Sequence, residues 1–305
     1  MPPPSQHPVF GRLVPDRWNQ DLLTFRQFPF LRLFWRSNAH ESLRQLTGQQ
    51  RVWVDNWPDY VAEIARIPAR RNADVYAALG ARGVYEVTVN PPRKGGVPND
   101  AQASAFDYFL KNEESICRNV IDALQRYYNF ARAQSVEWFE GLPSNPTVAQ
   151  LAATIDFDGV FVCRFSANGM SAVRLAWDPL WDAEHGLQMV LYRDDVIAIG
   201  TDLDEPDALC RPSLAGLWGP QQMTLAENAA RAAFCQSLDV GDFESLHAEE
   251  ARTDAGPKSL GPQETACARC GKTIWRSTAN KYHGYCRGCA FQNGLTTGCR
   301  DEVNP

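Results

Sequence analysis

Four cysteines toward the C-terminal end have the residue types and spacing of a metal site. Cys267 and Cys270 form one Cys-x-x-Cys pair, fifteen residues follow, and Cys286 and Cys289 form a second pair. Zinc accepts a tetrahedral shell of thiolates, and two pairs at this spacing are typical of a four-cysteine zinc ribbon. Because four protein ligands close the shell, the sequence predicts one structural Zn²⁺ ion, with no position for a substrate.

The segment around these cysteines is also basic and aromatic. Residues 261–305 hold six lysines and arginines against three acidic residues, a net charge of +3, whereas the whole chain carries −6. Trp275, Tyr282 and Tyr285 lie among the basic residues. Aromatic rings interleaved with positive charge can stack on single-stranded nucleic acid, and they can equally form the small core of a ribbon. The sequence leaves both interpretations open.

A second group with chemical potential is the turn from Trp181 to Gly186. It contains Asp182, Glu184 and His185. A histidine titrates near neutral pH and a glutamate can orient it, so a hydrolase-like site using His185 with Glu184 or Glu113 is one interpretation. The alternative is that these side chains organise a turn in which Gly186 takes a positive φ. Neither a Ser or Cys nucleophile motif nor a His-Glu-x-x-His helix accompanies them.

The strongest predicted element before this turn is one long amphipathic helix. Asn99 is a candidate N-cap with Gln102 as its capping-box partner, and apolar residues recur at spacings of three and four from Phe106 to Tyr128. Gln102 and Glu113 fall on or beside this apolar stripe. Either they lie at its edge and reach water, or they are buried and paired, because an unpaired buried carboxylate is costly.

The other elements predict an α+β fold, in which an antiparallel β-meander packs against the long helix. Strand patterns occupy the ranges 22–25, 30–35, 51–54, 83–89, 160–165, 173–177, 187–191 and 196–199. Residues 59–80 predict a helix that is interrupted near Pro68, and residues 221–238 predict a further amphipathic helix.

Composition and charge limit the classes of protein to which the chain can belong. With 305 residues, 44% of them hydrophobic, the chain can bury a full core. We expect an α+β body over residues 1–238, an acidic flexible linker over 239–264 and the zinc ribbon over 265–305. The net charge gives no whole-chain reason to expect nucleic acid or an anionic membrane as partner. The sequence lacks a signal-peptide pattern and a long apolar run, so we expect a cytoplasmic location.

The turn also carries a resemblance. The run from Trp181 to Leu187, followed by Val196–Gly200, is similar to an uncharacterised bacterial family with a Trp-Asp-x-Glu-His-Gly-Leu signature. The segment that opens with Pro98–Gln102 and the long helix that follows also resemble that family, so the similarity covers about residues 85–205. The family is a domain of unknown function, often suspected of immunity-type roles beside bacterial toxins. The resemblance implies a binding role, and the zinc ribbon lies outside it.

Three functional interpretations follow. The leading one is a non-enzymatic binding protein, of immunity type, whose acidic body suits a basic protein partner and whose zinc ribbon contributes to partner binding. The second is a nucleic-acid-binding or regulatory protein that acts through the basic ribbon. The third is the hydrolase-like enzyme. Candidate binding residues are Gln102, Glu113, Trp181, Asp182, Glu184 and His185.

Overall fold

The computed structural model describes most of the N-terminal body and a small part of the C-terminal segment. The described residues are 5–16, 21–34, 46–65, 73–92, 96–182, 186–200, 203, 222–238, 264–266 and 273–275. The chain divides into two compact units, Met1–Phe243 and Glu244–Pro305.

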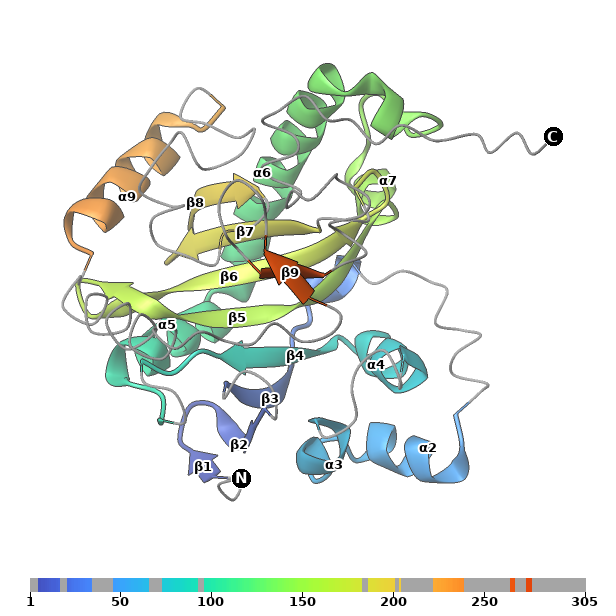
Figure 1. Cartoon of the computed structure of the whole chain (residues 1–305), viewed down its shortest axis with the longest axis vertical. Coiled ribbons are helices and arrows are strands. Elements are labelled where there is room, and N and C mark those ends of the chain that lie inside the picture. The colour runs from blue at the N-terminus through green and yellow to red at the C-terminus, as the bar shows by residue number, and fades with distance from the viewer. Residues whose placement is uncertain are drawn as a thin grey trace. The chain divides into compact units, whose positions relative to one another are not determined.

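The described part of the first unit is built on one eight-stranded sheet, in which the strands follow chain order (Figure 1). Every neighbouring pair is antiparallel except β4 and β5, which are parallel. The strands are β1 (Ser5–His7), β2 (Gly11–Pro15), β3 (Leu22–Gln27), β4 (Val84–Val89), β5 (Ile155–Ala167), β6 (Met170–Pro179), β7 (Leu187–Tyr192) and β8 (Asp195–Gly200). The predicted antiparallel meander is therefore confirmed as β5–β8.

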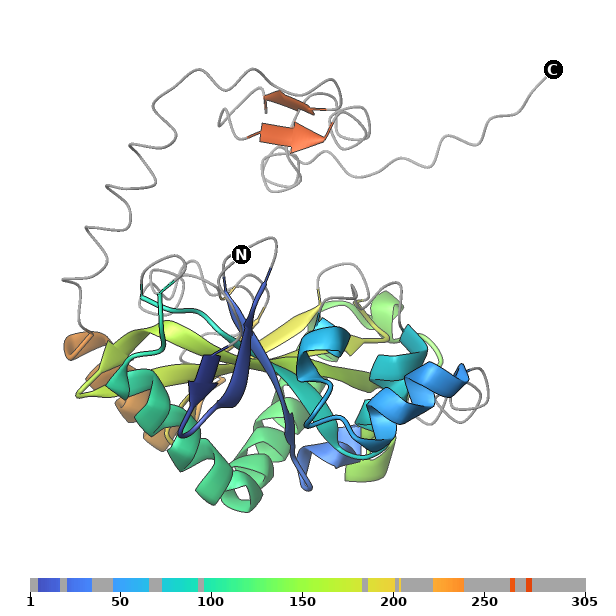
Figure 2. The same cartoon turned by 90° about the horizontal axis from the view of Figure 1, so that it is seen from below.

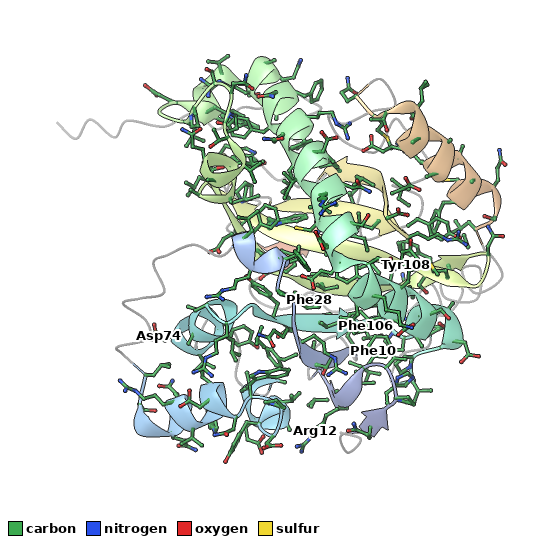
Figure 3. The ribbon with its side chains drawn as sticks, turned by 180° about the vertical axis from the view of Figure 1, so that it is seen from behind. Phe10, Arg12, Phe28, Asp74, Phe106 and Tyr108 are labelled. Atoms are coloured by element: carbon green, nitrogen blue, oxygen red, sulfur yellow. The ribbon has the colours of Figure 1, made fainter. Side chains whose placement is uncertain are left out.

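Helices cover both faces of the sheet. The described α-helices are α2 (Gly48–Asp55), α3 (Val61–Ala65), α4 (Ala73–Gly80), α5 (Asp100–Lys111), α6 (Glu113–Gln134), α7 (Val148–Ala152) and α9 (Leu225–Gln236), with 3-10 helices η1 (Leu31–Phe34) and η3 (Val136–Phe139). Seen from behind, α5 and α6 lie across one face of the sheet, and the view from below shows them together on that side (Figures 3 and 2). They belong to the crossover that the parallel pair β4–β5 requires.

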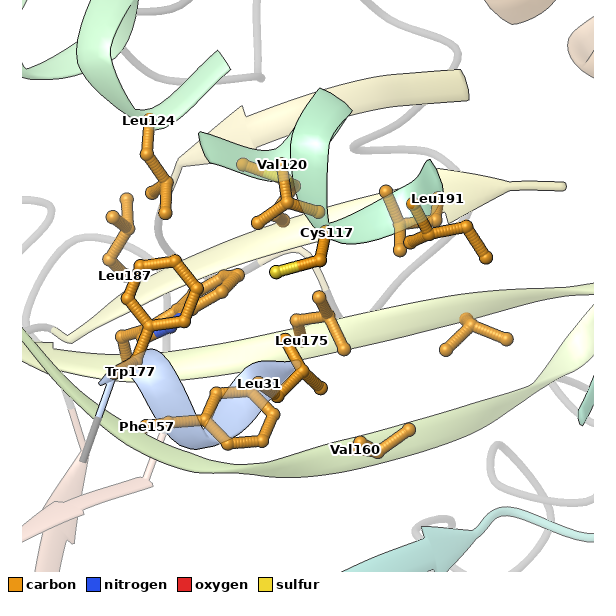
Figure 4. Close-up of a cluster of buried hydrophobic side chains, with 14 of the residues drawn as sticks. Leu31, Cys117, Val120, Leu124, Phe157, Val160, Leu175, Trp177, Leu187 and Leu191 are labelled. Atoms are coloured by element: carbon orange, nitrogen blue, oxygen red, sulfur yellow. The ribbon is translucent and has the colours of Figure 1, made fainter. Parts of the chain in front are cut away.

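The main core lies between this helical layer and the sheet. Alternate residues of β5 and β6 point into it, as the period of two in a strand dictates. Figure 4 shows side chains of these strands facing side chains of α6: Phe157, Val160, Leu175, Trp177, Cys117, Val120 and Leu124. The prediction of an α+β body with helices across one face of a meander is confirmed for this unit.

The opposite face is covered at one end by α2–α4. Val14, Phe25 and Val84 point away from the main core and pack with apolar residues of these three helices. At the other end, α9 packs along β8, the last strand of the sheet (Figure 1). Phe234 of α9 is fully buried there, and its ring lies against those of Phe165 and Tyr192. The middle of this face, on β4–β7, carries polar residues.

Two predicted strands are wrong. Residues Leu31–Phe34 form η1, in which Leu31 and Phe34 are buried while Phe30 and Leu33 remain exposed. Side chains three residues apart lie on the same side of a 3-10 helix, so Leu31 and Phe34 are buried together. The short apolar run that contains them resembles a strand in the sequence although it forms a helix. Residues 51–54 belong to α2, which starts at a Thr47–Gln50 capping box. That local helix signal outweighs the β-branched residues after it.

The predicted long helix is in fact two. α5 ends and α6 begins at Asn112, whose side-chain amide donates to the carbonyl of Tyr108 at 2.8 Å. A short amide side chain that bonds the backbone in this way competes with helix continuation. The predicted helix at residues 59–80 is confirmed as α3 and α4, and residues 66–72 lie outside the described part. The predicted helix at 221–238 is confirmed as α9.

Candidate functional site

Gln102 holds the start of α5 to the sheet. Its backbone N–H and side-chain oxygen complete the predicted capping box with Asn99. Its amide nitrogen donates to the carbonyls of Asn90 at 2.7 Å and Cys163 at 3.2 Å, and the side chain is fully buried. Of the two interpretations of this residue, burial with hydrogen-bond partners is therefore correct.

Glu113 is also buried and paired, with 6% of its surface exposed. One carboxylate oxygen accepts the N–H of Phe30 at 2.8 Å and that of Leu31 at 3.0 Å, so Glu113 fixes the start of η1. Burial raises the pKa of this carboxyl, and the two backbone hydrogen bonds oppose the shift. Gln102 donates to the carbonyl of Asn90, which directly follows the C-terminal end of β4. At the other end of β4, the N–H of Phe28, two residues before Phe30, donates to the carbonyl of Gly83. The structure thus places Gln102 and Glu113 at opposite ends of β4.

The turn after β6 is organised by aromatic packing. Trp181 is buried, with its ring stacked on Phe139 at 5.3 Å and edge-on to Tyr128 at 5.1 Å. Gly186 has a φ of +68°, as predicted, and its N–H donates to the carbonyl of Asp182. Asp182 is half-buried and raises the pKa of Tyr127, after the larger effect of burial. Glu184 and His185 lie outside the described residues.

The four predicted zinc ligands, Cys267, Cys270, Cys286 and Cys289, also lie outside the described residues. In the second unit, β9 (Glu264–Ala266) and β10 (Thr273–Trp275) pair antiparallel, with Ala266 opposite Thr273. Within the described part of the chain, no three His, Cys, Asp or Glu side chains are grouped so that they can hold a metal ion.

A group of polar side chains lies on the sheet face away from α5 and α6. Because β5 and β6 send alternate side chains into the main core, the residues between them point to the other face. Asp156 lies directly opposite Asp178 across the β5–β6 pair, and Asp158 occupies the bulge that follows. Glu86 of β4 is the neighbour of Gly159. We call these four carboxylates, Glu86, Asp156, Asp158 and Asp178, the acidic face.

A tyrosine positions one of these carboxylates. The hydroxyl of Tyr76 on α4 donates to Glu86 at 2.9 Å, and the Tyr76 ring contacts Phe25 edge-on. Burial raises the pKa of Glu86 to about 6. The hydrogen bond from Tyr76 opposes this shift, and the charges of Asp158 and Asp16 add to it. Glu86 is therefore a half-buried acceptor with a fixed orientation.

Asp158 is an exposed member of the acidic face and lies in the bulge of β5 between Phe157 and Gly159. Desolvation by the surrounding protein, and then the carboxylates of Asp178 and Asp156, raise its pKa to about 6. Asp178 is also exposed, and Asp156 is partly exposed. Like charges directly opposite each other in a sheet repel one another, as the carboxylates of Asp156 and Asp178 do here.

A guanidinium group borders the acidic face. Arg174 of β6 lies over the ring of Phe161 at 4.3 Å and donates to the side-chain oxygen of Gln188 at 3.2 Å. Asp16 and Asp21 flank the face at the ends of β2 and β3, and Asp16 acts on the pKa of Glu86. These six carboxylates influence one another together with Arg164 and Arg174, so the group carries a net charge of −4 when all are ionised. It can attract a cationic surface.

Sequence reasoning did not select Glu86, Asp156, Asp158 or Asp178. A partial signal exists in Ile155–Val160, where aspartates alternate with core residues in a strand pattern. What joins these carboxylates is the pairing of β4, β5 and β6, and the sequence does not give that pairing.

Comparison with known proteins gives one match. Residues 67–205 match the family described as a domain of unknown function (DUF6985). The match spans α4 to β8 and includes all four residues of the acidic face, and it agrees with the predicted resemblance to an uncharacterised family. Neither a curated protein nor a solved structure matches the chain. Among the described helices, none is long and apolar enough to cross a membrane.

Proposed function

We propose that the chain is a non-enzymatic binding protein that holds a basic protein partner on its acidic face. The observation that carries the proposal is the exposed carboxylate of Asp158, set beside Asp156, Asp178 and the fixed Glu86 on one surface of the sheet. Charge complementarity of this kind steers association and selects partners.

The partner's chemistry follows from the electrostatics of this surface. Asp178 and Asp156 raise the pKa of Asp158, so a lysine or arginine side chain placed beside Asp158 would lower that pKa again and bind its charged form. An immunity-type role, in which the partner is a basic toxin such as a nuclease, agrees with this charge. It also agrees with the resemblance of the turn at Trp181.

The second component of the proposal is a structural Zn²⁺ ion on Cys267, Cys270, Cys286 and Cys289. Its support is the antiparallel pairing of β9, which ends at Ala266, with β10, which begins at Thr273, so that one complete Cys-x-x-Cys pair lies between two paired strands. Metal ligation would supply most of the folding free energy of so small a module. Elemental analysis of the full chain should give one zinc per chain, with loss in Cys286→Ser and retention in the control Cys299→Ser.

Binding to the acidic face is tested by affinity purification from the organism that supplies the gene. The tagged full chain is compared with a triple variant, Asp156→Asn, Asp158→Asn and Asp178→Asn, at low salt. We expect the wild type to recover a basic protein in near-stoichiometric amount and the triple variant to lose it.

The matched control removes three carboxylates from the helical layer on the other side of the sheet. Asp122 and Glu137 are exposed and Asp107 is partly exposed, so the variant Asp107→Asn, Asp122→Asn and Glu137→Gln makes the same charge change. Retention of the partner by this control supports the proposal. Recovery of the wild-type chain alone, or equal loss in both triple variants, contradicts it.

A further inference from the structure

A second surface, on the opposite side of the sheet, is built for a different chemistry. A groove of about 520 Å³ lies between η1 and the first turns of α6. Its walls are Pro29, Phe30, Arg32 and Leu33 on one side and Glu114, Cys117, Arg118 and Ile121 on the other. Figure 4 shows Leu31 of η1 and Cys117 of α6 in the main core.

The groove exposes large apolar side chains. Phe30 is 42% exposed and Leu33 is 43% exposed, whereas Leu31 and Phe34 of the same short helix are fully buried. η1 is therefore anchored by one pair of residues and presents the other pair. Exposed apolar surface next to a groove is a common mark of an interaction site.

The anchoring of η1 is rigid and uses a buried charge. Glu113 accepts both the Phe30 and Leu31 N–H groups, and the thiol of Cys117 lies 3.7 Å from the Phe30 carbonyl. A buried carboxylate costs free energy unless it is hydrogen-bonded, and the two N–H groups of η1 supply these bonds to Glu113. Glu113 therefore holds η1 on α6. The groove is preformed, and a ligand would bind it without ordering η1 first.

The charges at the rim indicate what the ligand carries. Arg118 and Glu114 pair with each other on the same face of α6. Arg32 is exposed, and among the described residues its guanidinium group forms no ion pair. The groove thus combines an apolar wall with one cation, which complements an apolar side chain next to a carboxylate.

We propose that this groove binds a linear peptide segment of another protein in which bulky apolar residues neighbour an aspartate or glutamate. A small molecule fits less well, because such sites bury most of their ligand, whereas Phe30 and Leu33 on the wall of this groove are about as exposed as surface side chains. The α6 wall lies within the family match and the η1 wall lies outside it.

The test is selection of a random peptide library displayed on phage against the full chain, followed by fluorescence polarisation with the enriched peptides. We expect enriched sequences with Leu, Ile, Phe or Trp beside Asp or Glu. Leu33→Ser should weaken binding at least about tenfold, as loss of a central apolar contact does. The control Val52→Ser removes a side chain of similar exposure, 45%, from α2 and should leave the affinity within about twofold.

The role of Arg32 is tested by a double-mutant cycle. Replacing the peptide's acid by its amide should weaken binding to the wild type about tenfold and have little effect on binding to Arg32→Gln. Failure to enrich peptides, enrichment of basic peptides, or equal losses in Leu33→Ser and Val52→Ser would overturn the proposal. So would self-association of the full chain in sedimentation that Leu33→Ser abolishes, because the groove would then bind a second copy.

Discussion

Removal of the Glu113 carboxylate is the perturbation whose consequence the structure defines best. In Glu113→Ala, the N–H groups of Phe30 and Leu31 lose an acceptor at 2.8 and 3.0 Å. Leaving a buried donor without a partner costs about 1–3 kcal/mol, and a partly buried donor costs less because water can reach it. Relief of the burial that raises the Glu113 pKa offsets part of this loss. We therefore expect the free energy of unfolding to fall by about 2–3 kcal/mol.

Two further variants separate this effect from other causes. Glu113→Gln keeps a side-chain oxygen for both N–H groups, so its free energy of unfolding should stay within about 1 kcal/mol of the wild type. Glu114→Ala removes an exposed carboxylate from the adjacent position, where it pairs with Arg118, and should cost about 0.5 kcal/mol or less.

The assay is urea denaturation of the full chain followed by tryptophan fluorescence, at pH 7 and constant ionic strength. The reasoning is refuted if Glu113→Ala costs no more than Glu114→Ala, or if Glu113→Gln is as destabilised as Glu113→Ala. In the first case, η1 would not depend on the carboxylate. In the second case, the charge rather than the acceptor oxygen would hold it.

Three other predictions use the same assay or its pH dependence. Gln102→Met removes the donor that the carbonyls of Asn90 and Cys163 share, so the free energy of unfolding should fall by about 2 kcal/mol. Gln150→Met affects only the exposed capping box of α7 and should cost about 0.5–1 kcal/mol, and equal losses in the two variants would contradict the buried role of Gln102. Gly186→Ala places an L side chain at a φ of +68°, with its Cβ 3.3 Å from the Trp177 carbonyl, and should lower the free energy of unfolding by about 1–2 kcal/mol. In the control Gly48→Ala, the added Cβ meets nothing within 4 Å, so this variant should be neutral or more stable, and an equal loss in both variants would contradict a strained turn at Gly186. Because the pKa of Asp158 is raised from 3.8 to about 6, the folded chain binds its proton more tightly, so this group's contribution to stability falls as pH rises through that window; Asp158→Asn should reduce the drop in urea midpoint between pH 4.5 and 7, and an unchanged or larger drop would refute the shift.

Local patterns in the sequence predicted much of the body. The alternation of Val173, Leu175 and Trp177 gave β6, and the capping box of Asn99 and Gln102 gave the start of α5. The positive φ of Gly186 also followed from its place in a turn. These features depend on neighbouring residues, and such patterns are visible without knowledge of tertiary structure.

Features that depend on distant contacts were not predictable. Whether Glu113 reached water or was buried was decided by Phe30, 83 residues away. The same contact lies at the start of η1, the 3-10 helix that the apolar run at Leu31 forms. The acidic face required both the parallel pairing of β4 with β5 and the bulge at Asp158. Position in the sequence gave no information on either.

The second unit stands differently. Its four cysteines were the strongest chemical signal in the sequence, and the described strands β9 and β10 frame only the first Cys-x-x-Cys pair. Zinc stoichiometry of the full chain therefore tests that assignment independently of the acidic face.

The most direct test of the central claim is the affinity of the full chain for the basic partner recovered with it, measured at two ionic strengths. The account predicts that the triple variant Asp156→Asn, Asp158→Asn and Asp178→Asn binds at least about tenfold more weakly at low salt and shows a smaller salt dependence than the wild type. The matched variant Asp107→Asn, Asp122→Asn and Glu137→Gln should remain within about twofold of the wild type. Equal affinities for the two triple variants, or a wild-type affinity that does not change with salt, would contradict it.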